Sequence, residues 1–202
     1  MSESNNPYVS RGGLKLAAAL DAFAIEPAGF MCADLGCSTG GFTDCLLQRG
    51  AAHVYAVDTA YGELAWKLRQ DARVTVLERT NALHFDPWAQ LEGFAGCDLV
   101  TVDLGWTRQQ RAVPAALRWL KRDDPAAHLI TLIKPHYESQ GKALRGGRRG
   151  VLDAQEADEV WHRVIATLPD CGAEAVDWIA SPVRGGRRGG NIEYLALLRA
   201  RG

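Results

Sequence analysis

Short apolar runs alternate with stretches of helical periodicity along most of this chain. A short apolar run bounded by turn residues is typical of a buried strand, whereas apolar positions three and four apart predict a helix. The runs predict strands over residues 31–35, 54–57, 74–77, 98–102, 129–133, 173–179 and 192–198. The helical spacing predicts helices over residues 11–23, 41–49, 62–70, 87–92, 108–121 and 153–168.

Alternation of strands and helices predicts an α/β fold, a doubly wound and mostly parallel sheet with helices on both faces. The last two strands are different, because only about ten residues without helical pattern separate them, which favours an antiparallel pair. We therefore expect a seven-stranded sheet with an antiparallel last strand. The length of 202 residues suits a single domain over 1–202, in which the polar residues 1–7 form a disordered tail.

The turn after the first predicted strand gives the strongest indication of a ligand. Asp34 ends this strand, the pattern Gly36-x-x-x-Gly40-Gly41 follows, and Asp58 ends the next strand. Glycines let the backbone approach a nucleoside cofactor, a helix start offers free N–H groups, and the second acid accepts hydrogen bonds from ribose. The pattern matches neither the dinucleotide fingerprint nor the P-loop. The alternative, in which both acids only cap helices, is less favoured for the pair.

Charged residues also occupy positions where burial is costly. Lys134 and Asp103 each end an apolar strand, Glu193 lies inside the last predicted strand, and Lys15 lies on the first predicted helix. A solvated Lys15 and an outward-facing Glu193 are the ordinary alternatives. Two lysines and two acids near one edge of the sheet together favour a functional cluster.

The sequence Arg-Gly-Gly-Arg-Arg-Gly occurs twice, at residues 145–150 and 184–189, with a shorter echo at 11–13. We call the two long copies the arginine-glycine segments. Both follow a strand toward the ligand-binding edge, and both are locally basic although the whole chain has a net charge of −1. A local positive field attracts a polyanion, so we interpret the segments as RNA contacts rather than as solubilising loops. The predicted contacts are Arg11, Arg145, Arg148, Arg149, Arg184, Arg187 and Arg188.

Other classes of function find little support. The five cysteines form no C-x-x-C pair and are interpreted as reduced core residues of a cytoplasmic protein. The five histidines lack the spacing of metal ligands, so no metal is expected. No apolar run approaches the roughly 18 residues of a membrane span, so no membrane contact is expected.

Specific motifs run along nearly the whole chain. They lie at residues 8–16, 38–43, 54–58, 61–69, 77–82, 133–135 and 190–194. With these motifs the chain resembles the FtsJ-type RNA ribose 2′-O-methyltransferases, and within them the TlyA or hemolysin-like rRNA methyltransferase branch. The resemblance implies a Rossmann-like class I methyltransferase fold, S-adenosyl-L-methionine as cofactor, and ribosomal RNA or a ribosomal subunit as the partner.

The resemblance also implies roles for individual residues. A catalytic tetrad falls on Lys15, Asp103, Lys134 and Glu193. With the residues of the glycine turn included, the expected cofactor contacts are Asp34, Gly36, Ser38, Gly40, Gly41, Phe42, Asp58, Asn81 and Asp103. Lys134 is the expected general base, because burial and the Lys15 cation lower its pKa against the opposing effect of Asp103. Its alternative role is to steer the ribose hydroxyl while water takes the proton.

Two departures from the branch concern the RNA target. The chain is expected to lack the N-terminal S4 RNA-binding domain that the branch usually carries, and Gly105-Trp106 replaces the usual Ser-Phe of the branch. The arginines are expected to supply part of the missing RNA affinity, and Trp106, or Tyr137 with His136, to stack the target base. A non-catalytic RNA- or ribosome-binding module, and a methyltransferase acting on a small molecule or a protein, are the alternatives.

Overall fold

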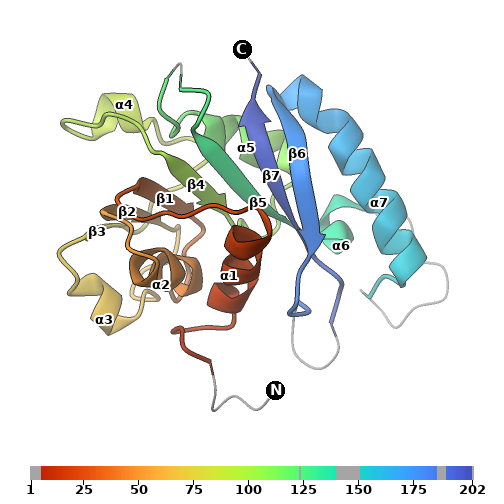
Figure 1. Ribbon diagram of the computed structural model, residues 1–202, viewed down its shortest axis with the longest axis horizontal. Helices are drawn as coiled ribbons and strands as arrows, with labels where there is room; N and C mark the ends of the chain where they lie inside the picture. Colours follow the sequence, from red (N-terminus) through yellow and green to blue (C-terminus); the bar gives the residue numbers. More distant parts are fainter. Residues whose placement is uncertain (1–5, 123, 140–150, 186–189, 202) are drawn as a thin grey trace.

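The computed structural model describes residues 6–122, 124–139, 151–185 and 190–201 (Figure 1). The elements in chain order are α1 (Gly12–Ala22), β1 (Met31–Leu35), α2 (Gly41–Gln48), β2 (His53–Val57), α3 (Trp66–Arg69), β3 (Val74–Leu77), α4 (Pro87–Gln90), β4 (Leu99–Val102), α5 (Gln109–Leu117), β5 (His128–Ile133), α6 (Pro135–Glu138), α7 (Ala154–Thr167), the 3₁₀ helix η2 (Leu168–Cys171), β6 (Ala173–Ala180) and β7 (Tyr194–Ala200).

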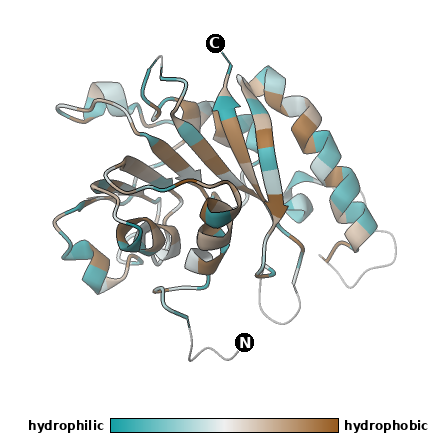
Figure 2. Cartoon of the chain, in the orientation of Figure 1, coloured by the Kyte–Doolittle hydropathy of each residue, from teal (hydrophilic) through white to brown (hydrophobic). Residues whose placement is uncertain are grey.

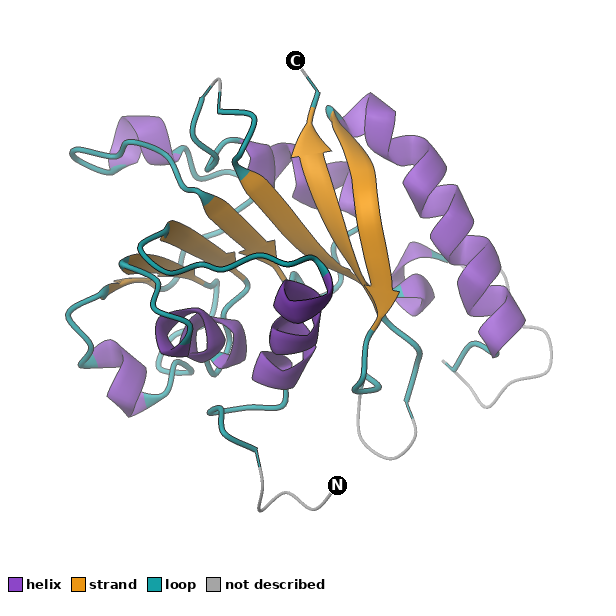
Figure 3. Cartoon of the chain, in the orientation of Figure 1, coloured by secondary structure: helices purple, strands orange, loops and turns teal. Residues whose placement is uncertain are grey.

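The described strands form one seven-stranded sheet in the order β3-β2-β1-β4-β5-β7-β6 (Figure 3). β1 to β5 pair in parallel with their neighbours. β7 lies between β5 and β6 and is antiparallel to both. The predicted mostly parallel sheet with an antiparallel last strand is therefore confirmed.

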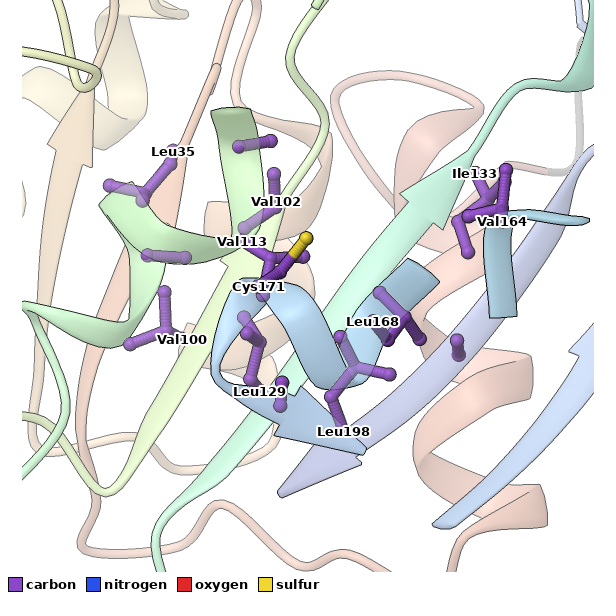
Figure 4. Close-up of a cluster of buried hydrophobic side chains, with 14 of the residues drawn as sticks. Leu35, Val100, Val102, Val113, Leu129, Ile133, Val164, Leu168, Cys171 and Leu198 are labelled. Carbon is purple, nitrogen blue, oxygen red and sulfur yellow. The ribbon is translucent and has the colours of Figure 1, made fainter. Parts of the chain in front are cut away.

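Alternate residues of the central strands face two separate apolar cores, as expected for a sheet covered on both faces. On one face α5 and α7 cover Val100 and Leu129 (Figure 4). On the other face α1 and α2 cover Leu99 and Ile130. The central strands are mostly hydrophobic, and α7 alternates hydrophobic with hydrophilic residues (Figure 2). All five cysteines are buried and none is in a disulfide, which confirms that they are core residues.

The helices of the connections are shorter than the sequence predicts. Ala65 has an extended backbone just before α3, so that only the end of the 62–70 stretch is helical. The 87–92 and 108–121 stretches likewise form only α4 and α5. α7 matches its prediction because the Asp153 side chain and Glu156 form a complete capping box.

Two differences concern the chain after β5 and the start of β7. The sequence did not predict α6, which begins directly after Lys134 because Pro135 suits the first position of a helix. The last strand begins at Tyr194, so Glu193 precedes β7 instead of lying within it.

The chain segments after β5 and β6 leave the sheet at the same edge. Ile133 at the end of β5 pairs with Tyr194, and Tyr194 pairs with Ala180 at the end of β6. This edge also carries the carboxyl ends of β1 and β4, where ligands bind in open α/β sheets. Arg145, Arg148, Arg149, Arg187 and Arg188 lie outside the described residues.

Candidate active site

The turn after β1 brings two strand ends into direct contact. Gly36 has φ +89°, and a Cβ atom there would lie 2.5 Å from the carbonyl oxygen of Asp103, which follows β4. Only glycine fits this approach, because a side chain would displace the backbone of the neighbouring strand end. Gly40 then caps α2 with a left-handed backbone, so that the helix starts at the carboxyl edge of the sheet.

Asp34 lies beneath this turn and is fully buried. Its Oδ2 accepts hydrogen bonds from the Thr43 backbone N (2.9 Å) and the Thr43 Oγ1 (2.7 Å). Its Oδ1 accepts a hydrogen bond from Thr101 Oγ1 at 3.3 Å. Burial raises the pKa of Asp34 to about 7, although the Thr43 hydrogen bonds oppose the shift. Asp34 therefore fixes the first turn of α2, and it also lines a cavity of about 240 Å³ together with Ser38, Gly41 and Phe42.

Asp58 follows β2 and faces the same edge. Its Oδ2 accepts a hydrogen bond from the Ser38 backbone N, and its Oδ1 accepts one from the Ala60 backbone N, both at 2.8 Å. A cavity of about 410 Å³ lies beside it, and Asn81 and Asp103 also line this cavity. Its size and its few convergent polar groups fit a nucleoside cofactor.

Two ion pairs at this edge each join residues that are far apart in the sequence. Lys15 Nζ lies 2.5 Å from Glu193 Oε2. Lys134 Nζ pairs with Asp103 Oδ1, a buried oxygen that receives no hydrogen bond from any other group within the described residues. The Glu193 side chain is only 3% exposed and that of Lys134 16%. A buried carboxylate is tolerated when it is paired in this way.

The two ion pairs border one continuous site. Lys15, Lys134 and Glu193 line a cavity of about 380 Å³. Lys15 and Asp103 also line the cavity of about 240 Å³ at the glycine turn, and Lys134 and Asp103 line the one of about 410 Å³ beside Asp58. The structure thus brings the four predicted catalytic residues together with the predicted cofactor contacts.

The expected direction of the Lys134 pKa is wrong. Burial lowers this pKa, but the carboxylates of Asp103 and Glu193 outweigh burial, so that the pKa of Lys134 is raised. The sequence analysis included Asp103 but not the action of Glu193 on Lys134. Lys134 is therefore an ammonium in the resting protein. Burial and the two lysine cations together lower the pKa of the neighbouring His136.

Trp106 and Tyr137 form an aromatic pair beside Lys134. Their ring centroids are 4.7 Å apart with an interplanar angle of 35°, and Trp106 is 85% exposed. The His136 ring lies 4.1 Å from the Tyr137 ring, and Lys134 Nζ lies 5.8 Å from the Tyr137 centroid. The pair places the exposed ring of Trp106 near the paired lysine. We call Trp106 and Tyr137 the aromatic shelf.

Two of the predicted RNA contacts, Arg11 and Arg184, are described by the structure. Arg11 precedes α1 and Arg184 follows β6, and both line the cavity of about 240 Å³ with Lys15. Basic groups from distant parts of the chain therefore border the same opening. Among the described residues, no group of side chains is arranged to hold a metal ion, and no helix is long and apolar enough to span a membrane.

The sequence analysis missed Asn191. This residue is buried, and its Oδ1 accepts a hydrogen bond from the Leu152 backbone N at 2.8 Å. Its carbonyl oxygen accepts another from the Gly185 backbone N at 3.0 Å. The available signal was its place in the 190–194 motif, two residues before Glu193.

Comparisons with known proteins agree with this geometry. The FtsJ-like methyltransferase family matches residues 8–200. The chain is 44% identical over 200 residues to the 16S/23S rRNA (cytidine-2′-O)-methyltransferase TlyA of Mycobacterium tuberculosis (strain H37Rv), an alignment that covers 98% of this chain and 71% of that protein.

Two solved structures resemble the fold. A protein of Streptococcus thermophilus, described as a candidate hemolysin, is 35% identical with a TM-score of 0.88, covering 99% of this chain and 70% of that one. Aeropyrum pernix fibrillarin in complex with S-adenosyl-L-methionine has a TM-score of 0.60 at 23% identity, over 92% of this chain and 76% of that one, and supports the fold alone. The chain therefore belongs to the FtsJ-like methyltransferase family, whose methyl donor is S-adenosylmethionine.

Proposed function

We propose that the protein methylates the ribose 2′-oxygen of RNA, with ribosomal RNA, free or in a ribosomal subunit, as its substrate. The observation that carries this proposal is the pairing of Lys15 with Glu193 and of Lys134 with Asp103 at one continuous site. The M. tuberculosis relative, named for cytidine 2′-O-methylation of 16S and 23S rRNA, supports the same substrate class.

The chain has the residues that would hold the cofactor. Asp58 and Asn81 would bind its nucleoside part, the turn from Gly36 to Phe42 would approach it with backbone N–H groups, and Asp103 would face its methionine part. When bound, S-adenosylmethionine supplies an electrophilic methyl group on a sulfonium.

The difficult partner is the ribose hydroxyl, because it is a weak nucleophile. The site has to hold its oxygen about 3–3.5 Å from the carbon that it attacks. Since the pKa of Lys134 is raised, we assign Lys134 to orienting this oxygen as an ammonium, while water accepts the proton. Asp103 fixes the direction of that ammonium, and Glu193 holds Lys15 beside it.

The surroundings of the tetrad suit RNA. The aromatic shelf offers a plane on which the target base stacks. Arg11 and Arg184, with the arginine-glycine segments, bind the phosphates on either side, since arginine forks match phosphate oxygens.

Transfer of a tritiated methyl group from S-adenosylmethionine to total RNA tests the proposal, followed by mapping of ribose methylation in the products. We expect label on ribose 2′-oxygens, lost in Lys134→Ala and retained in Lys121→Ala. Lys121 is a matched control because its ion pair with Asp98, which precedes β4, lies at the opposite edge of the sheet. Salt-dependent RNA binding without any transfer would instead indicate a non-catalytic RNA-binding module.

A further inference from the structure

We propose that Asn191 is a positioning residue that couples the Glu193 carboxylate to the ends of both arginine-glycine segments. The proposal rests on the proposed function, since it assigns Asn191 a part in RNA methylation. It concerns a residue that is not among those lining the cofactor cavity beside Asp58.

The hydrogen bonds of Asn191 join two connections of the sheet. Its side-chain Oδ1 accepts from the Leu152 backbone N at 2.8 Å, and Leu152 stands two residues after the first segment ends at Gly150. Its carbonyl oxygen accepts from the Gly185 backbone N at 3.0 Å, and Gly185 belongs to the second segment. One buried residue therefore fastens the end of one segment to the start of the other.

Asn191 also holds the backbone of Gly185, which packs against the Glu193 side chain. Gly185 lies directly against that carboxylate, because a Cβ atom at position 185 would be 2.1 Å from Glu193 Oε1. Glu193 also continues the pairing of β6 and β7, since its carbonyl oxygen accepts from the Ser181 backbone N at 2.8 Å. A shift of Asn191 would thus move the backbone wall that holds Glu193 against Lys15.

The position of Asn191 at the site makes this coupling relevant to catalysis. Asn191 and Gly185 line the cavity of about 380 Å³ that also contains Lys15, Lys134 and Glu193. Binding of RNA phosphates near the segment ends would therefore affect the position of Glu193. The path consists of the hydrogen bonds of Asn191 to Leu152 and Gly185 and the close contact of Gly185 with Glu193. A purely structural amide is expected to affect stability alone.

Gln109 provides the matched comparison. This buried amide also makes two hydrogen bonds, accepting from Thr131 Oγ1 at 2.8 Å and donating to the Leu132 carbonyl oxygen at 3.4 Å. Among the described residues, both partners of this amide lie on β5 and not at a segment end. Gln109→Leu therefore measures the cost of losing a buried amide without the proposed coupling.

The test compares Asn191→Leu, Asn191→Asp and Gln109→Leu by methyl transfer to rRNA and by amide hydrogen exchange. We expect Asn191→Leu to lower kcat by about tenfold or more, because a buried donor loses its partner beside the tetrad, with KM for S-adenosylmethionine within about twofold. Exchange should accelerate in peptides over 151–155 and 181–185. Asn191→Asp keeps the acceptor and should restore slow exchange, and Gln109→Leu should lower Tm while kcat stays within about twofold.

A kcat loss in Asn191→Leu no larger than in Gln109→Leu would overturn the proposal. Unchanged exchange in the peptide that contains Gly185 would overturn it as well. If the unaltered protein methylates no RNA, the proposed function fails, whereas the exchange measurement still decides whether Asn191 couples the two connections.

Discussion

The ammonium of Lys15 lies 2.5 Å from the Glu193 carboxylate, although 178 positions separate the two residues in the sequence. Lys15 belongs to α1 and Glu193 immediately precedes β7, so that the pair joins an early helix to the last strand. Both side chains are nearly buried, at 11% and 3% exposure. Removal of one partner therefore leaves a buried charge without compensation, which costs more than removal of both.

A double-mutant cycle should show this asymmetry. Lys15→Met is expected to lower the free energy of unfolding by about 3 kcal/mol, because Glu193 stays buried and unpaired. The double variant Lys15→Met with Glu193→Gln should lose less free energy of unfolding than Lys15→Met alone. Urea denaturation measures both values, and Lys121→Met, whose ion pair is more exposed, should lose about 1 kcal/mol or less. Equal losses for the single and double variants would contradict the expectation.

Lys134 variants separate an orienting ammonium from a general base. Lys134→Ala should lower kcat by about 10²–10³-fold, the effect of losing a preorganised electrostatic contact, and Lys134→Arg should retain part of the rate because it keeps the charge. Since the pKa of Lys134 is raised, kcat should stay level through mildly alkaline pH and decline only when this ammonium deprotonates. If kcat instead rises through the same pH range and Lys134→Arg is inactive, Lys134 acts as a general base.

Asp34 should make stability depend on pH. Its folded-state pKa of about 7 lies above the unfolded value, so the folded protein binds this proton more tightly, and stability is lost as pH rises from about 4 to about 7. The hydrogen bonds at this position do not require a charge, because the amide of Asp34→Asn still accepts from Thr43 and donates to Thr101. The free energy of unfolding of Asp34→Asn, measured by chemical denaturation, should equal that of the unaltered protein at acidic pH. At pH 8 it should be higher by up to about 3–4 kcal/mol. The exposed Asp177→Asn serves as control, and an advantage that does not grow with pH would contradict the assignment.

Trp106 should contribute to RNA affinity and not to cofactor affinity. Loss of one stacked base costs about 1–3 kcal/mol, so Trp106→Ala should raise KM for RNA by about 5- to 100-fold, and Trp106→Phe should recover most of it. The affinity for S-adenosylmethionine, measured by titration, should be unchanged in both variants. Trp66→Ala is the control, because Trp66 is also exposed, at 73%, but lies on α3. An unchanged KM for RNA in Trp106→Ala would exclude the aromatic shelf as a base platform.

The arginines predicted to contact RNA should determine the salt dependence of binding. Neutralising Arg145, Arg148, Arg149, Arg184, Arg187 and Arg188 should weaken RNA binding and flatten the plot of log affinity against log salt by about 0.7 per lost phosphate contact on single strands. Replacement of the exposed Arg111 and Arg163 on α5 and α7 provides a control for the effect of each lost positive charge away from the site. RNA affinity that survives the six changes would refute this role.

Local patterns were sufficient to predict the site wherever a residue stands at a strand end. The turn at Gly36, the acid Asp58 and the Lys134–Asp103 neighbourhood follow from parallel strands that all end at one edge. The resemblance placed Glu193 in one tetrad with Lys15, and the structure pairs the two. Local patterns alone do not give this pair, because it depends on the long-range insertion of β7 beside β5. The predicted direction of the Lys134 pKa was wrong because the carboxylate of Asp103, and after it that of Glu193, outweigh burial, and local patterns do not give the strength of these contacts.

The place of β7 in the sheet sets an order of assembly. β6 is synthesised before β7, yet in the sheet it pairs only with β7 and has no other neighbour among the described strands. It must therefore wait for the following strand, while β5 keeps an open edge. The same insertion brings Glu193 to the site, so the tetrad cannot be complete before β7 lies between β5 and β6. A chain that transfers methyl groups with the full tetrad has therefore already inserted β7.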